Sequence, residues 1–240
     1  MAGGRGIGSV TRTSDGTTSL RDEAELLVDE AETLLEEVAN AVTHGIGAAL
    51  SIAALAILVT LAAVDGGTGT IAAAAVYGTT LIVAYTSSTL YHGVWHQGAK
   101  RLFLACDHCA IFLLIAGTYT PVTLLALPKP LGWILCAVLW SLAAAGIALR
   151  LWLGRLSALL IPLFLAMGWL GFAWSGTVLD SIGASGWWLL VAGGVAYTAG
   201  LAFYAWRRLP FNHAVWHLFV LAGSVCHFFA VVDHVLPLAA

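Results

Sequence analysis

The chain has 240 residues, of which 60% are hydrophobic and only 10% are charged, and its mean hydropathy is +0.91. Soluble globular domains carry roughly 25% charged residues, so this composition excludes a water-soluble protein. The formal net charge of −3 is small and no basic stripe is present, which excludes nucleic acid as a partner. The sequence is therefore that of an integral membrane protein.

The first forty residues differ from the rest because they hold most of the acidic side chains. Residues 1–20 are rich in Gly, Ser and Thr, which predicts a disordered tail. Eight of the thirteen acidic residues lie between Asp22 and Glu37, among apolar residues that recur every three or four positions. This pattern predicts a short acidic amphipathic helix over 21–38, packed on the cytoplasmic face of the protein rather than on anionic lipids.

The remainder, 39–240, is predicted to be a membrane domain, because long apolar segments alternate with short polar separators. Each segment approaches or exceeds the roughly 20 residues that cross a bilayer as a helix. We therefore predict an all-α fold, a bundle of seven transmembrane helices, in a multi-pass protein of the inner (plasma) membrane of the cell. The expected segments are 40–63, 70–95, 103–127, 131–150, 156–175, 187–206 and 210–236.

The basic residues between the segments predict the orientation of the chain. Six of them lie in loops that share the side of the N-terminus, whereas only Lys129 lies on the opposite side. Because cytoplasmic loops are enriched in Lys and Arg, the N-terminus is expected in the cytoplasm and the C-terminus outside. The six basic residues are Lys100, Arg101, Arg150, Arg155, Arg207 and Arg208.

Four polar side chains are expected at one depth of this apolar bundle. His213 and His217 are four residues apart, which places both imidazoles on one face of a helix. His92 and Asp107 lie on two other segments at similar distances from the basic loops. At 1.5 Å per residue, all four would lie about 7 to 14 Å inside the cytoplasmic boundary. Ionisable side chains are costly at that depth, so their convergence predicts a functional site.

Three histidines and a water form the open arrangement of a catalytic zinc site. We therefore predict that His92, His213 and His217 hold zinc. Asp107 is predicted to orient the water and take its proton, and Ser88, one turn from His92, to hydrogen-bond the water or a substrate carbonyl.

Plainer interpretations of these residues stay open at this point. The pattern of the three histidines is also typical of core residues whose hydrogen bonds are satisfied within the protein. The position of Asp107 is also typical of a structural partner for Arg101 or His108. Ser88 is also typical of helix packing in membranes. Two further histidines are interpreted as structural groups or as hydrogen-bond partners of the ligands, namely His44 and His227.

Four stretches resemble the signature blocks of a known family. They are EEVANAVTHGIGA (36–48), SSTLYH (87–92), DHCAIFLLIAGTYTP (107–121) and HAVWHLFVLAGSVCHF (213–228). They resemble the hemolysin III family, the bacterial branch of the PAQR membrane proteins, which includes the adiponectin receptors. The resemblance rests on S-x-x-x-H, a third-segment Asp and H-x-x-x-H occurring in that order, and it covers the predicted membrane region.

The resemblance implies zinc bound by His92, His213 and His217, with a water between the metal and Asp107 and Ser88. Through the alkaline ceramidases of the wider superfamily, it also implies hydrolysis of a lipid amide or ester. We therefore expect a zinc-dependent hydrolase of membrane lipids that contributes to membrane lipid homeostasis. Two alternatives stay open, a non-enzymatic zinc-stabilised sensor of membrane fluidity and a pore-forming cytolysin. No feature of the sequence fixes an oligomeric state.

Overall fold

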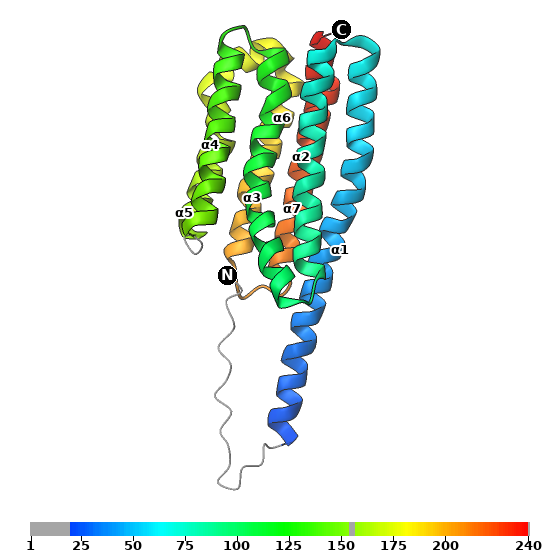
Figure 1. Cartoon of the computed structure of the whole chain (residues 1–240), viewed down its shortest axis with the longest axis vertical. Helices are drawn as coiled ribbons and strands as arrows, with labels where there is room; N and C mark the ends of the chain where they lie inside the picture. The colour runs from blue at the N-terminus through cyan, green and yellow to red at the C-terminus, as the bar shows by residue number, and fades with distance from the viewer. Residues whose placement is uncertain (1–19, 154–156, 240) are drawn as a thin grey trace.

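The computed structural model describes residues 20–153 and 157–239, and these residues form helices without a strand among them. The helices run alongside one another as one bundle (Figure 1). The predicted all-α fold class is therefore confirmed. The predicted disordered tail, except for Leu20, lies outside the described residues.

The helices follow the apolar segments of the sequence closely. The main helices are α1 (Leu20–Asp65), α2 (Thr68–Gly93), α3 (Gln97–Pro121), α4 (Leu131–Leu153), α5 (Ser157–Gly168), α6 (Ser175–Ala205) and α7 (Asn212–Ala230). Short turns continue or join them, namely the π-helical Val122–Ala126 and Val231–Val235 and the 3₁₀-helical Leu170–Trp174 and Leu236–Ala239.

Six stretches of the described chain are long and apolar enough to cross a membrane. The longest, Leu160–Ala205, has 46 residues and covers most of two predicted segments, 156–175 and 187–206. Gly183 interrupts its helical path with φ 73° and ψ 170°, a conformation that favours glycine. The stretch also changes neighbours, because α5 packs against α3 and α4 whereas α6 packs against α7. These features favour two crossings there, but the count of seven and the orientation of the termini stay predictions.

The first helix is longer than the sequence analysis expected. α1 is unbroken from Leu20 to Asp65, so the backbone joins the predicted acidic helix to the first membrane segment. Its first part projects beyond the end of the bundle (Figure 1). The Glu36 carboxylate accepts a hydrogen bond from the backbone N–H of Phe211 at 3.1 Å, which ties α1 to the start of α7.

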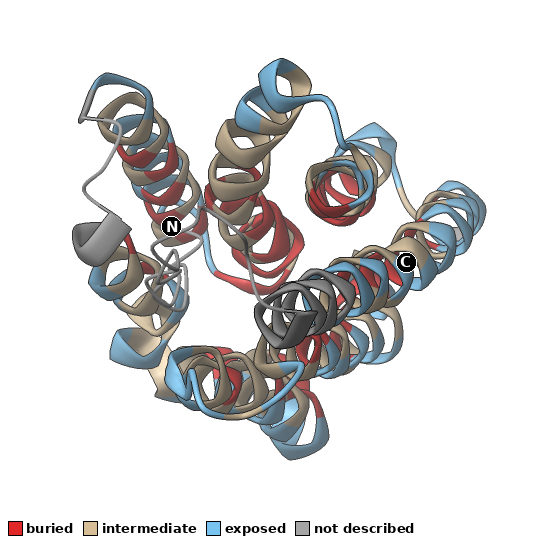
Figure 2. Cartoon of the chain, turned by 90° about the horizontal axis from the view of Figure 1, so that it is seen from below, coloured by how far each residue is buried: buried red, intermediate tan, exposed pale blue. Residues whose placement is uncertain are grey.

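Buried residues face the inside of the bundle and exposed residues face outward (Figure 2). The central core includes Leu58, Tyr77 and Tyr85, and a second cluster is built around Phe112 between α3, α4 and α5. The outer surface carries many exposed large apolar side chains, including Trp152 at 88% exposure. Such a surface suits lipid and not water, so the protein is a multi-pass membrane protein.

Close contact between α1 and α2 predicts the effect of a small substitution. A Cβ atom at Gly78 would lie 2.6 Å from Cδ1 and 2.9 Å from the backbone Cα of Leu55. Because the backbone cannot yield as a side chain does, Gly78→Ala should lower the free energy of unfolding by about 1–3 kcal/mol. Thermal unfolding of the detergent-purified protein measures this change.

Gly69→Ala is the matched control in the same helix, because no described atom lies within 4 Å of its added Cβ. It should be neutral or slightly stabilising, since Ala favours a helix more than Gly does. Equal stability of the two variants would contradict the close packing of α1 on α2.

Candidate metal centre

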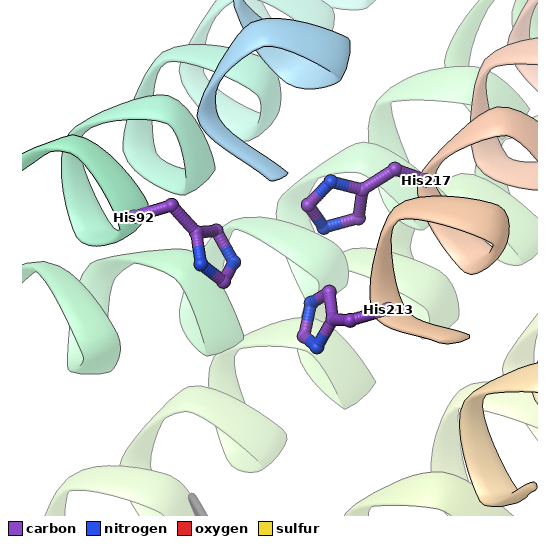
Figure 3. Close-up of side chains that lie close together, drawn as sticks. All are labelled: His92, His213 and His217. Carbon is purple, nitrogen blue, oxygen red and sulfur yellow. The ribbon is translucent and has the colours of Figure 1, made fainter. Parts of the chain in front are cut away.

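Three histidines from two helices meet at one end of the bundle (Figure 3). His92 is the penultimate residue of α2, and His213 and His217 lie in the first two turns of α7. One ring nitrogen from each lies within 4.8 Å of the other two. Their ring centroids are 4.6 to 5.3 Å apart. The structure thus brings together the three side chains that the sequence analysis selected as metal ligands.

The expected depth of about 7 to 14 Å, however, overstates how far these three histidines lie from the end of the bundle. It assumed that the helices reach the basic loops. α2 instead ends at Gly93, and α7 begins only at Asn212. Because the intervening residues are not helical, a rise of 1.5 Å per residue does not apply to them.

The hydrogen bond of His92 fixes which of its nitrogens is available to a metal. Nδ1 lies 2.8 Å from Oε2 of Glu37, and a carboxylate oxygen can only accept, so Nδ1–H donates. In the neutral ring, Nε2 therefore carries the lone pair. This atom is buried and has no hydrogen-bond partner among the described residues. A buried ring nitrogen without a partner is costly, which makes it a suitable ligand atom.

His217 is held in the same tautomer by α1. Its Nδ1 lies 3.2 Å from the carbonyl oxygen of Asn40 and 3.1 Å from Oγ1 of Thr43. The Thr43 hydroxyl already donates to the carbonyl of Ala39 at 2.8 Å, so both oxygens accept from Nδ1–H. The lone pair of His217, which is 1% exposed, is then on Nε2.

This donor set fits zinc. Zinc binds imidazole nitrogens at about 2.0–2.1 Å in tetrahedral geometry, which separates two ligand atoms by about 3.4 Å. The three nitrogens lie within 4.8 Å of one another, so small side-chain rotations close the difference. Neutral imidazoles also suit other divalent transition metals. The cluster can therefore hold a divalent metal ion.

Ser88 and Asp107 lie beside the histidines. Ser88 is on α2, one turn before His92, and is 2% exposed. Its side chain lies close to the carboxylate of Asp107, on α3, which is also near His92. One alternative partner considered for Asp107, His108, instead accepts a hydrogen bond from Nε of Arg150 at 2.9 Å. The catalytic roles of Ser88 and Asp107 stay predictions.

The two remaining histidines of interest differ in position. His44, which is 7% exposed, stacks on His217 with a centroid distance of 3.4 Å and an interplanar angle of 13°. It covers one face of that ring without joining the three-histidine group. His227 lies away from the cluster, where its Nε2 atom is 3.1 Å from the carbonyl oxygen of Leu190.

Sequence reasoning missed the contribution of α1 to the site. Glu37, Asn40 and Thr43 contact the ligand histidines, but none of them was selected as a site residue. A signal was available, because Glu37, Asn40 and His44 are spaced i, i+3 and i+7. That spacing places them on one face of a helix.

Fold and cluster together define a polytopic helical membrane protein with a buried three-histidine site. Residues 32–228 match the family model described as "Haemolysin-III related". Because this match covers most of the chain, the protein belongs to the haemolysin III family.

Curated relatives agree with this assignment. "Hemolysin-3" of Bacillus cereus is 46% identical over 204 residues, which are 85% of this chain and 93% of the relative. "Hemolysin-3 homolog" of Bacillus subtilis (strain 168) is 42% identical over 196 residues, 81% of this chain and 92% of the relative. Human "Monocyte to macrophage differentiation factor" is 30% identical over 162 residues, 65% of this chain and 67% of the relative.

The three-histidine geometry predicts metal content. The wild-type protein, purified without chelator, should contain a divalent metal, and His217→Ala should lose it because one of three ligands is gone. Elemental analysis of both proteins measures this. His96→Asn is the control, since it removes an imidazole that caps α3 through Ala99 N but leaves a side chain suited to the cap. Equal metal content in the wild type and His217→Ala would contradict the site.

Proposed function

We propose that the protein is a zinc-dependent hydrolase of membrane lipids that cleaves a lipid amide or ester and so contributes to membrane lipid homeostasis. One observation carries this proposal. A carboxylate, Asp107, lies close to Ser88 and to His92, which belongs to a cluster of three histidines able to bind a metal. A metal site and an adjacent base are the two parts that hydrolysis of a carbonyl compound needs.

The chain supplies the acid–base and positioning groups of this reaction. Bound zinc would act as a Lewis acid on a carbonyl group and increase the acidity of water. Asp107 accepts the proton of the attacking water, and the nearby Ser88 hydroxyl hydrogen-bonds that water or the substrate carbonyl. Ser88 and the ligand His217 are 2% and 1% exposed, so bulk water is largely excluded around them.

The position of the cluster supports a lipid substrate. His92 and His213 lie near helix ends, at the same end of the bundle. The ester and amide bonds of membrane lipids lie near the headgroups and therefore near helix ends as well. With an apolar outer surface around the bundle, a lipid can approach from the side.

Replacement of the base should separate chemistry from metal binding. Asp107→Asn is expected to lower hydrolysis of ceramide or phospholipid in vesicles by about 10²–10⁴-fold, because general base catalysis is lost. Its metal content should stay at the wild-type level, since the three histidines are intact. Asp180→Asn, at an exposed position, is the control and should keep full turnover. A zinc-loaded wild type that turns over none of the lipids tested would overturn the hydrolase proposal.

A second candidate function is a non-enzymatic sensor of membrane fluidity stabilised by the metal. It is favoured by the fact that the histidines come from α2 and α7, so a bound ion would tie two helices together. Under either function, His213→Ala should lower the melting temperature measured in the presence of the metal. After chelation, the melting temperatures of the variant and the wild type should be similar. Differential scanning calorimetry measures both states, and a variant that melts like the metal-loaded wild type would contradict metal-linked stability.

The two functions then differ at Asp107. A sensor tolerates Asp107→Asn without loss of its effect on membrane fluidity, whereas a hydrolase loses that effect together with lipid turnover. Fluorescence anisotropy of a lipid probe in cells that express each variant reports the difference.

A further inference from the structure

Glu37 joins three helices at the metal centre. Its Oε2 atom accepts a hydrogen bond from Nδ1 of His92 on α2 at 2.8 Å, and its Oε1 atom lies 3.2 Å from Nζ of Lys100 on α3. The side chain of His92 is 3% exposed, and those of Glu37 and Lys100 are 23% and 24% exposed. Both carboxylate oxygens are thus engaged, one by a ligand histidine and one by a cation.

The two contacts hold the carboxylate in one place. Lys100 is itself restrained, because its ammonium group lies 5.3 Å from the ring centroid of Tyr91. A charged hydrogen bond from an imidazole N–H to a carboxylate is stronger than one to a neutral acceptor. Glu37 therefore fixes both the tautomer and the ring orientation of His92, and the Nε2 lone pair remains for the cluster.

α1 also fixes the tautomer of a second ligand histidine, His217. Within two turns after Glu37, the Asn40 carbonyl and the Thr43 hydroxyl accept a hydrogen bond from Nδ1–H of His217. Two of the three ligand histidines thus have their Nδ1–H groups bound by α1, although α1 contributes no ligand to the three-histidine group. A helix that binds the outer nitrogens of two ligands can set the direction of both inner nitrogens.

We propose that α1 is the positioning helix of the metal centre, with Glu37 as the positioning residue that orients His92 toward the metal. The inference rests on the metal-binding part of the proposed function and not on lipid hydrolysis. It assigns a role to the segment around Glu37, at the end of the acidic run. It also predicts that loss of the Glu37 carboxylate weakens metal binding although all three ligands are present.

An exposed carboxylate on another helix provides a control. Asp180, on α6, carries the same charge as Glu37 and lies at an exposed position. Asp180→Ala and Glu37→Ala each replace a carboxylate side chain with a methyl group. Of the two carboxylates, Glu37 is the one that accepts a hydrogen bond from a ligand histidine.

The test is a zinc competition titration of the full-length protein in detergent against a chelator of known affinity. Glu37→Ala should weaken zinc affinity about 10–100-fold, the usual cost of losing a hydrogen-bond partner of a ligand histidine. Glu37→Gln should restore part of this loss, because its amide oxygen is a neutral acceptor for Nδ1–H. Asp180→Ala should keep the wild-type affinity. Wild-type affinity in Glu37→Ala would overturn the inference.

Cobalt(II) substitution adds a readout that a general loss of stability does not produce. The visible spectrum of bound cobalt(II) depends on the coordination geometry, so it should change in Glu37→Ala and be unchanged in Asp180→Ala. An identical spectrum in all three proteins would overturn the positioning role. The outcome is independent of catalysis, since a wild type that binds zinc but hydrolyses no lipid refutes only the hydrolase proposal. A wild type that binds no metal refutes both.

Discussion

The hydrogen-bonding demand of buried imidazoles is the constraint on which the site depends. A neutral imidazole has one donor and one acceptor, and in an apolar bundle neither can rely on water. For His92 and His217 the donors are satisfied by α1. What remains is two lone pairs in a cluster whose ligand nitrogens lie within 4.8 Å of one another. Lone pairs cannot satisfy each other, so the arrangement requires a cation or a proton donor between them.

This demand accounts for the way the helices meet at this end of the bundle. α7 provides two imidazoles through its four-residue spacing, and α2 provides the third at its last turn. α1 reaches this end of the bundle with Glu37 and Asn40, which precede the part of the helix that packs deep in the core. The projecting first part of α1 in Figure 1 is thus continuous with the segment that orients the ligands.

Local pattern was enough to predict much of this architecture, but contacts between distant segments were not accessible. The apolar segments gave the helices, and the spacing of His213 and His217 gave their shared face. Glu37 was not selected because it ends a run of acidic residues that is typical of a solvated helix, and its partner His92 is 55 residues away. The helix ends were misplaced because Val94 and Trp95 are as apolar as the helix before them.

The stretch from Asp180 to Gly186 shows a related limit. Its Asp, Ser and Gly residues are typical of a loop, which the sequence analysis expected there. The structure keeps helical geometry on both sides and breaks it at Gly183. Composition locates the interruption, but only the backbone dihedral angles determine how short it is.

The choice between a lipid hydrolase and a metal-stabilised sensor depends on the carboxylate beside the histidines. A metal that only ties α2 to α7 needs ligands and their hydrogen-bond partners, which three histidines and α1 supply. It does not need Asp107 as a ligand, and removal of this carboxylate from water costs free energy. A half-buried carboxylate beside a metal site is expected where its capacity to accept a proton is used. That cost is the physical reason to favour hydrolysis over a purely structural metal.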